Sequence, residues 1–284
     1  MLKKIFFAAA LLLASELIAK PVVIASIAPV EYLAKAVGGD KIEVQSLAKG
    51  DVHSYEPKPN DMKAVAKARI FIAAGLEFEE AWIPRFKASA KNLVVVKSDA
   101  KIAKLKEERG EQAEHDEKHE AHADPHVWLN PMLAITMARN ISDALIDMDK
   151  ANKDFYLENF QKLMNDLLAF DESAKESLAG LKNRKFVVYH PAWGYFAAHY
   201  DLEQISIERS GKEPKIDEMA STLKMIKDEN IKVIFADPNR SQKSAQTLAS
   251  QTGAKVELLD PLGYNLLENL KIAVGAIKDA NSPK

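Results

Sequence analysis

The chain contains no cysteine among its 284 residues. Disulfides cannot hold it together, so its stability must come from a hydrophobic core, which a chain of this length can supply. We expect no lipid anchor near the N-terminus, because the attachment would need a cysteine thiol. Any metal site must use His, Asp, Glu or water as ligands.

Excess basic charge and long apolar runs are also missing. The 39 Lys and Arg side chains are outnumbered by 41 Asp and Glu, giving a formal net charge of −2, and no basic patch suggests binding to nucleic acid. Beyond the N-terminus, no stretch approaches the roughly 20 apolar residues that a membrane-spanning helix needs. The H-E-x-x-H pattern of many zinc hydrolases does not occur.

Residues 1–19 have the three-part pattern of a secretory signal peptide. Lys3 and Lys4 form a basic start, residues 5–14 form a short apolar run, and the small residue Ala19 precedes Lys20. We expect cleavage after Ala19. Because no cysteine offers a lipid anchor, we expect a free periplasmic protein from a Gram-negative cell.

Short apolar segments alternate with helical patterns, in the same order in both halves of the chain. This alternation predicts an α/β fold with two Rossmann-like lobes and parallel sheets, at residues 20–151 and 182–284. The segments are 22–26, 42–47, 69–74 and 93–97, and then 186–190, 203–207, 232–236 and 255–259. A Glu-Pro-Lys turn follows the second segment of each half, in HSYEPKPNDM (53–62) and SGKEPKIDEM (210–219). We interpret this repeated turn as the start of a helix.

Residues 152–181 predict one long amphipathic helix between the lobes. Apolar side chains recur at three- and four-residue spacing, and they are Phe160, Leu163, Met164, Leu167 and Leu168. At 1.5 Å per residue, such a helix would be roughly 42 Å long. A rod of this kind would keep motion between the lobes small.

Four potential metal ligands lie in connecting loops, two in each half of the chain. His53 follows the second strand, His190 directly follows the apolar residues 186–189, Asp260 directly follows the segment 255–259, and His126 lies in the Pro-bounded loop DPHVWLNP (124–131). Ligands of parallel α/β sheets bind beyond the carboxyl ends of the strands, and three imidazoles with a carboxylate suit zinc. Each histidine alone could be a structural hydrogen-bonding group, as we expect for His199, and Asp260 could be a turn residue.

A segment rich in His and acidic residues, about 108–124, offers a second and weaker set of ligands. His115, His119 and His122 are spaced four and three residues apart, so they would share one face of a helix or act as a flexible chelator. The alternative is a solvated charged loop in which the histidines are incidental.

Several motifs together resemble the ZnuA-type substrate-binding proteins, which are the cluster A-I zinc and manganese receptors of bacterial ABC importers. The motifs are GDVHSYEPKP, DPHVWLNP, VVYHPAWGYFAAHY, GKEP and LLDPLG, and the resemblance runs from about Pro21 to the C-terminus. It implies two lobes joined by a rigid helix, a metal in the cleft, and a His-rich loop. It also implies a monomeric receptor, not an enzyme, with a membrane permease and a cytoplasmic ATPase as partners.

The resemblance also bears on the ligands. It matches His53, His126 and His190 to the three histidine ligands and Asp260 to the carboxylate that water replaces in some members. Manganese receptors of the family have Glu where this chain has His190, and an added imidazole favours zinc over manganese. Iron, copper and nickel stay open as alternative metals for the site.

We therefore expect a protein that binds Zn²⁺ and catalyses no reaction. Its affinity for zinc should fall as the pH drops through about 6.5, where imidazoles take up protons.

Two other classes of protein remain as alternatives. A secreted three-His zinc hydrolase or lyase would keep an open position for water. An adhesin would need a surface anchor, which the sequence does not offer.

Overall fold

The computed structural model describes residues 20–106, 123–208 and 216–281. The expected signal peptide, the histidines at 115, 119 and 122, and the second Glu-Pro-Lys turn at 213–215 lie outside these ranges. Within them, no helix is both long enough and apolar enough to cross a membrane.

The first lobe is built on a four-stranded parallel sheet in the order β2-β1-β3-β4. Its strands are β1 (Val22–Ala25), β2 (Glu43–Ser46), β3 (Ile70–Ala73) and β4 (Val94–Lys97). The central strands β1 and β3 are almost wholly buried, whereas the edge strands β2 and β4 are partly exposed. Continuous apolar runs are what a parallel strand needs when helices cover both of its faces.

The second lobe repeats this sheet in the order β6-β5-β7-β8, again with every strand parallel to its neighbours. Its strands are β5 (Lys185–Val188), β6 (Glu203–Ser206), β7 (Val233–Ala236) and β8 (Lys255–Leu258). In both lobes the second strand flanks the first and the third lies on its other side. The predicted α/β fold with two parallel sheets is confirmed.

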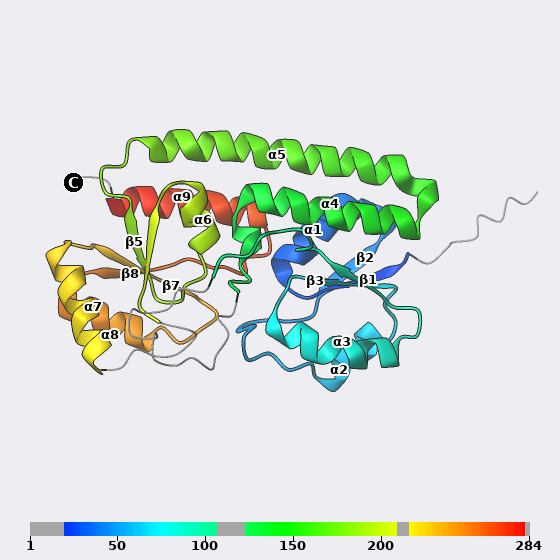
Figure 1. The fold of residues 1–284 in the computed structure, drawn as a ribbon, viewed down its shortest axis with the longest axis horizontal. Helices are drawn as coiled ribbons and strands as arrows, with labels where there is room; N and C mark the ends of the chain where they lie inside the picture. The colour runs from blue at the N-terminus through cyan, green and yellow to red at the C-terminus, as the bar shows by residue number, and fades with distance from the viewer. Residues whose placement is uncertain (1–19, 107–122, 209–215, 282–284) are drawn as a thin grey trace, which may run out of the picture.

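Helices surround both sheets, and α5 runs along one side of the whole molecule (Figure 1). In the first lobe, α2 and α3 lie on the face of the sheet away from α4 and α5 (Figure 1). The α-helices are α1 (Ala28–Gly38), α2 (Pro59–Val65), α3 (Glu77–Ser89), α4 (Pro131–Met148), α5 (Lys153–Ala179), α6 (Gly194–His199), α7 (Ile216–Asp228), α8 (Lys243–Thr252) and α9 (Leu266–Asn281). Short 3₁₀ helices include η1 (Gly39–Lys41), η3 (Val127–Leu129) and η4 (Lys150–Asn152).

The predicted long helix corresponds to α5, which has 27 residues. It packs on α1 and α4 of the first lobe and on α9, which follows the strands of the second lobe. The lobe boundaries at residues 151 and 182 stay a prediction.

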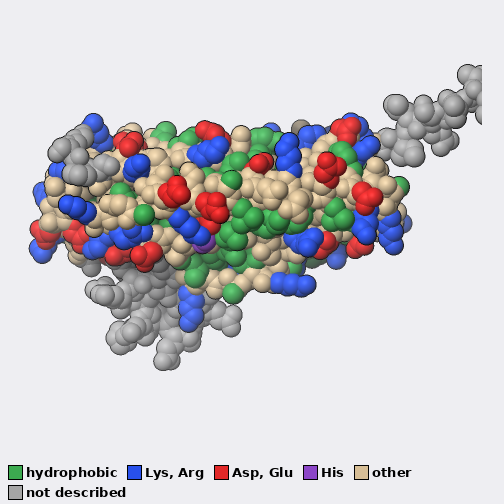
Figure 2. Space-filling view, turned by 90° about the horizontal axis from the view of Figure 1, so that it is seen from above, with side chains coloured by type: hydrophobic (Ala, Val, Ile, Leu, Met, Phe, Trp, Pro, Cys, Tyr) green, Lys and Arg blue, Asp and Glu red, His purple; other side chains and the backbone are tan. Residues whose placement is uncertain are grey.

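The buried face of α5 differs from the predicted stripe. Phe160, Leu163 and Leu167 are buried, but Leu168 is 37% exposed. Leu168 follows Leu167 directly and is therefore turned by about 100° around the helix, away from the packed seam. Figure 2 shows the side of the molecule along which α5 runs, where charged side chains are scattered around a patch of apolar atoms near the middle.

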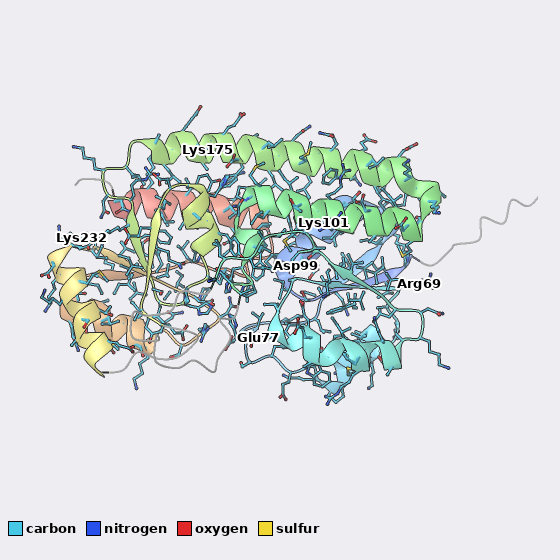
Figure 3. The ribbon with its side chains drawn as sticks, in the orientation of Figure 1. Arg69, Glu77, Asp99, Lys101, Lys175 and Lys232 are labelled. Atoms are coloured by element: carbon cyan, nitrogen blue, oxygen red, sulfur yellow. The ribbon has the colours of Figure 1, made fainter. Side chains whose placement is uncertain are left out.

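Asp171 links α5 to α6. Asp171 is buried and accepts hydrogen bonds from Lys175 Nζ at 2.7 Å and from His199 Nε2 at 2.6 Å. Lys175 stands on α5 and is labelled in Figure 3. His199 is thus occupied by a structural contact, as expected from its position in the sequence.

Candidate metal centre

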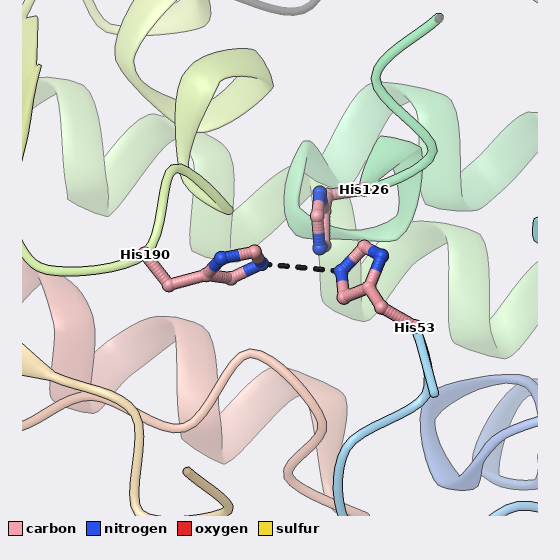
Figure 4. A group of neighbouring side chains, drawn as sticks. All are labelled: His53, His126 and His190. Carbon is pink, nitrogen blue, oxygen red and sulfur yellow. Dashed lines mark hydrogen bonds between the residues drawn. The ribbon is translucent and has the colours of Figure 1, made fainter. Parts of the chain in front are cut away.

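Three of the predicted ligands converge from loops that are far apart in the sequence. His53 lies in the loop after β2, His126 immediately before η3, and His190 just after β5. Each ring offers a nitrogen that lies within 4.8 Å of those of the other two, and the rings face one another (Figure 4). His126 and His190 are only 4% and 7% exposed, whereas His53 lies on the open side of the group.

The spacing of the nitrogens suits one shared ion. The Nε2 atoms of His53 and His190 are 3.2 Å apart. Two nitrogens of a tetrahedral zinc site, each about 2.0–2.1 Å from the ion, would be about 3.3 Å apart. A zinc ion could therefore bind both rings with almost no movement of either.

A carboxylate orients the ring of His126. The Nδ1 atom of His126 lies 2.7 Å from Oδ1 of Asp124, and the same oxygen accepts the backbone N–H of His126 at 2.9 Å. A neutral imidazole that donates from Nδ1 has its lone pair on Nε2. Carboxylates placed in this way fix metal-binding histidines and make them more basic.

His190 is oriented in the same manner by Glu208. Its Nδ1 lies 2.7 Å from Oε2 of Glu208, which is buried two residues after the end of β6. Nη2 of Arg240 donates to the other carboxylate oxygen at 2.9 Å, and Nη1 of Arg240 lies 3.0 Å from Nδ1 of His190. Since Nδ1 donates its proton to Glu208, the approach of Nη1 places a cation beside the ring without a second hydrogen bond. Burial raises the pKa of Glu208, and the charge of Arg240 opposes that rise.

Two of the imidazoles are held neutral. Although His53 is the most exposed of the three, desolvation of its ring, followed by the charges of His126 and His190, lowers its pKa to about 4. Burial, followed by the charges of His126 and Arg240, lowers the pKa of His190 well below its usual value. Histidine must be neutral to bind a metal, so for these two rings competition from protons begins below the pH of about 6.5 that the sequence suggested.

Asp260 lies outside the group of three histidines. Its Oδ1 accepts hydrogen bonds from Asn239 Nδ2 at 2.7 Å and from the backbone N–H of Leu262 at 2.9 Å. Asp260 therefore stabilises a turn, which is the alternative to metal binding that the sequence analysis gave for it. The structure brings together three of the four predicted ligands, and a ligand role for Asp260 stays a prediction.

The sequence did not identify the residues that orient the ligands. Asp124 lies two residues before His126, at the spacing that lets a short carboxylate reach the next-but-one backbone N–H. Glu208 directly follows a strand segment, as His190 does, and that position could have singled it out. Arg240 carried no such signal, because its role depends on where the loop after β7 places its long side chain.

Comparison with known proteins identifies the family. Residues 23–280 match the family model described as zinc-uptake complex component A, periplasmic. A putative metal-binding protein of Treponema pallidum is 34% identical over 243 residues, with 82% of this chain and 77% of the relative covered. The high-affinity zinc uptake system protein ZnuA of Bacillus subtilis is 30% identical over 279 residues, covering 91% of this chain and 86% of the relative.

A solved structure agrees with these matches. The crystal structure of a ZnuA superposes with a TM-score of 0.85 at 35% identity, covering 93% of this chain and all of that one. Both the matching length and the shared fold extend across the two lobes. The chain belongs to the ZnuA family of zinc-uptake substrate-binding proteins.

Proposed function

We propose that this chain is a high-affinity periplasmic receptor that captures Zn²⁺ and delivers it to an ABC-type importer. The observation that carries the proposal is the convergence of three imidazoles on one point, with two of them oriented by buried carboxylates. The name of the Bacillus subtilis relative, a high-affinity zinc uptake protein, supports the same function.

In this proposal His53, His126 and His190 bind the ion through nitrogen, and Asp260 or water completes the coordination. Three nitrogen ligands favour zinc over manganese, which prefers oxygen. Oδ1 of Asp260 accepts from Asn239 and Leu262, and the residue lies outside the three-histidine group, so its side chain would have to move to reach the ion.

The receptor would act without chemical transformation. It would bind the ion as a monomer and pass it to a membrane permease that a cytoplasmic ATPase drives. The two carboxylates in contact with the histidine rings, Asp124 and Glu208, are engaged with those rings. Neither is placed to act as the general base that a zinc hydrolase would need.

The test is stabilisation by zinc of protein purified without a histidine tag. Zinc at 100 times its dissociation constant should raise the free energy of unfolding by about 2.7 kcal/mol. His126→Ala and His190→Ala should lose most of this gain, because each removes a nitrogen ligand. Unfolding of each variant, measured with and without zinc, checks this.

The matched control is His199→Gln, which changes a histidine outside the group and should keep the full response to zinc. If the double variant His126→Ala/His190→Ala is still stabilised as strongly as the unmodified chain, the ion binds elsewhere and the proposed site is wrong.

A further inference from the structure

A partly buried cation lies behind one of the three histidines. Arg240 pairs with Glu208 through Nη2 and approaches Nδ1 of His190 to 3.0 Å through Nη1. The side chains of Arg240 and Glu208 are 20% and 4% exposed. Charges in such surroundings are screened much less than charges in water.

The turn that carries Arg240 is fixed by hydrogen bonds. The backbone N–H of Arg240 donates to the carbonyl of Asp237 at 3.2 Å, and that of Asn239 donates to Oδ1 of Asp237 at 2.7 Å. The side chain of Asn239 also donates to Asp260. The guanidinium therefore approaches His190 from a turn at the carboxyl end of β7 whose backbone is held by hydrogen bonds.

The distance of the Arg240 guanidinium from the three-histidine group determines how strongly it repels a bound divalent ion. Nη1 lies 3.0 Å from the far nitrogen of the His190 ring, so an ion bound at Nε2 would be on the order of 7 Å from the guanidinium. The positive charge of Arg240 repels a cation at that distance, and the negative charge of Glu208 attracts it. The pair is close to neutral as a whole, whereas Glu208 alone would strengthen binding.

We propose that Arg240 sets the zinc affinity of the site, because its charge offsets that of Glu208 and keeps the bound ion releasable. This inference rests on the proposed function as a zinc receptor. A receptor has to surrender its ion to the permease, and differences in affinity between closely related sites are expressed mostly in the dissociation rate. Arg240 would thus balance capture against release.

Four variants test the charge balance. Arg240→Met removes the charge but keeps much of the side-chain volume, and it should tighten zinc binding by between about tenfold and a thousandfold and slow dissociation. Glu208→Gln should weaken binding. The double variant should lie between the two single variants, and Arg240→Lys, which keeps the charge, should restore most of the dissociation rate that Arg240→Met loses.

Zinc affinity is measured by competition with a chromophoric chelator, and the dissociation rate by transfer of zinc to excess chelator. Arg85→Met is the matched control, since Arg85 stacks on Trp82 in α3 at 4.5 Å from the ring centroid and lies in the other lobe. It should change neither quantity. Weaker or unchanged zinc binding in Arg240→Met would overturn the inference and leave Arg240 a purely structural residue.

Loss of folding in Arg240→Met would not end the test. Glu208→Gln can then be compared with the double variant, and removal of Arg240 should still tighten binding in that background. If the unmodified chain does not bind zinc, the proposed function has failed. If the chain binds zinc through its histidines but the variants rank differently, only the inference about Arg240 has failed.

Discussion

At the scale of residues, the candidate metal centre is a set of ring nitrogens whose protonation is controlled by neighbours. Asp124 and Glu208 accept the Nδ1 protons of His126 and His190. The Nε2 atoms thereby carry the lone pairs, and that of His190 lies in hydrogen-bond contact with Nε2 of His53 at 3.2 Å. Preorganisation of this kind lowers the cost of ordering the ligands when the ion binds.

The lowered pKa values predict how the stability of the metal-free protein depends on pH. In the unfolded chain His53 titrates near its ordinary value of about 6.5, whereas in the folded chain its pKa is about 4. Between these values the unfolded state binds more protons, so the stability present above pH 6.5 is lost as the pH falls towards 4. The pKa of His190 is shifted in the same direction.

Urea unfolding from pH 7 to pH 4 at constant ionic strength measures this dependence. His53→Gln, which cannot titrate, is the reference because it shares the buried carboxylates that titrate in the same range. The free energy of unfolding should fall more steeply for the unmodified chain than for this variant. Equal slopes would mean that His53 keeps an ordinary pKa in the folded protein.

At the scale of elements, side-chain caps start the helices next to the ligand loops. Asp61 in the first turn of α2 accepts the backbone N–H of Lys58 at 2.7 Å and the hydroxyl of Tyr55 at 2.9 Å. The first Glu-Pro-Lys turn thus leads into a helix, as predicted, and this places His53 in a loop that is tied at its end. Asn130 is the N-cap residue of α4, four residues after His126.

The Asn130 cap predicts a measurable loss of stability. Its Oδ1 accepts the backbone N–H groups of Met132 at 2.9 Å and Leu133 at 3.3 Å. Asn130→Ala leaves both donors without this partner and should cost about 1 kcal/mol. Chemical denaturation gives the difference, and Asn130→Asp, which retains a capping oxygen, should recover most of it. A loss as large in Asn130→Asp would point away from capping.

At the scale of the whole molecule, the two lobes are joined by direct contacts in addition to α5. The indole N–H of Trp128 donates to the carbonyl of Pro261 at 2.7 Å. The hydroxyl of Tyr195, in α6, accepts the backbone N–H of Leu105 and donates to the carbonyl of Asp124, each at 2.8 Å. The second lobe therefore holds the backbone of the residue that orients His126.

Tyr195→Phe should destabilise the protein by about 1–3 kcal/mol, because it leaves a partly buried N–H and a carbonyl without their partner. Zinc affinity should fall as well, since the backbone of Asp124 loses its support. Unfolding experiments and zinc titration check the two effects. Tyr264→Phe is the control, because Tyr264 is 48% exposed. Full stability in Tyr195→Phe would show that this contact does not secure the lobes.

Much of the fold could be predicted from the sequence. Apolar segments at regular intervals, helix starts such as Asp61, and one long stretch without proline are local features, and they indicate parallel strands, helices and α5. The exposure of Leu168 was missed because the exact seam on α5 depends on what packs against it. His53 and His190 were candidates because they lie in loops after strands, where ligands of parallel sheets bind, whereas His126 was a candidate because of its Pro-bounded loop.

The sequence by itself determined the repeated α/β pattern, the loops that carry the histidines and the absence of thiol ligands. Only the tertiary structure decided that Asp124 and Glu208 would orient the rings, that Arg240 would lie behind His190, and that Asp260 would hold a turn. The physical reason is that strand and helix patterns follow from neighbouring residues. The contacts of Glu208 and Arg240 with His190 join residues 18 and 50 positions apart, so they depend on how the loops of the second lobe fold over its sheet.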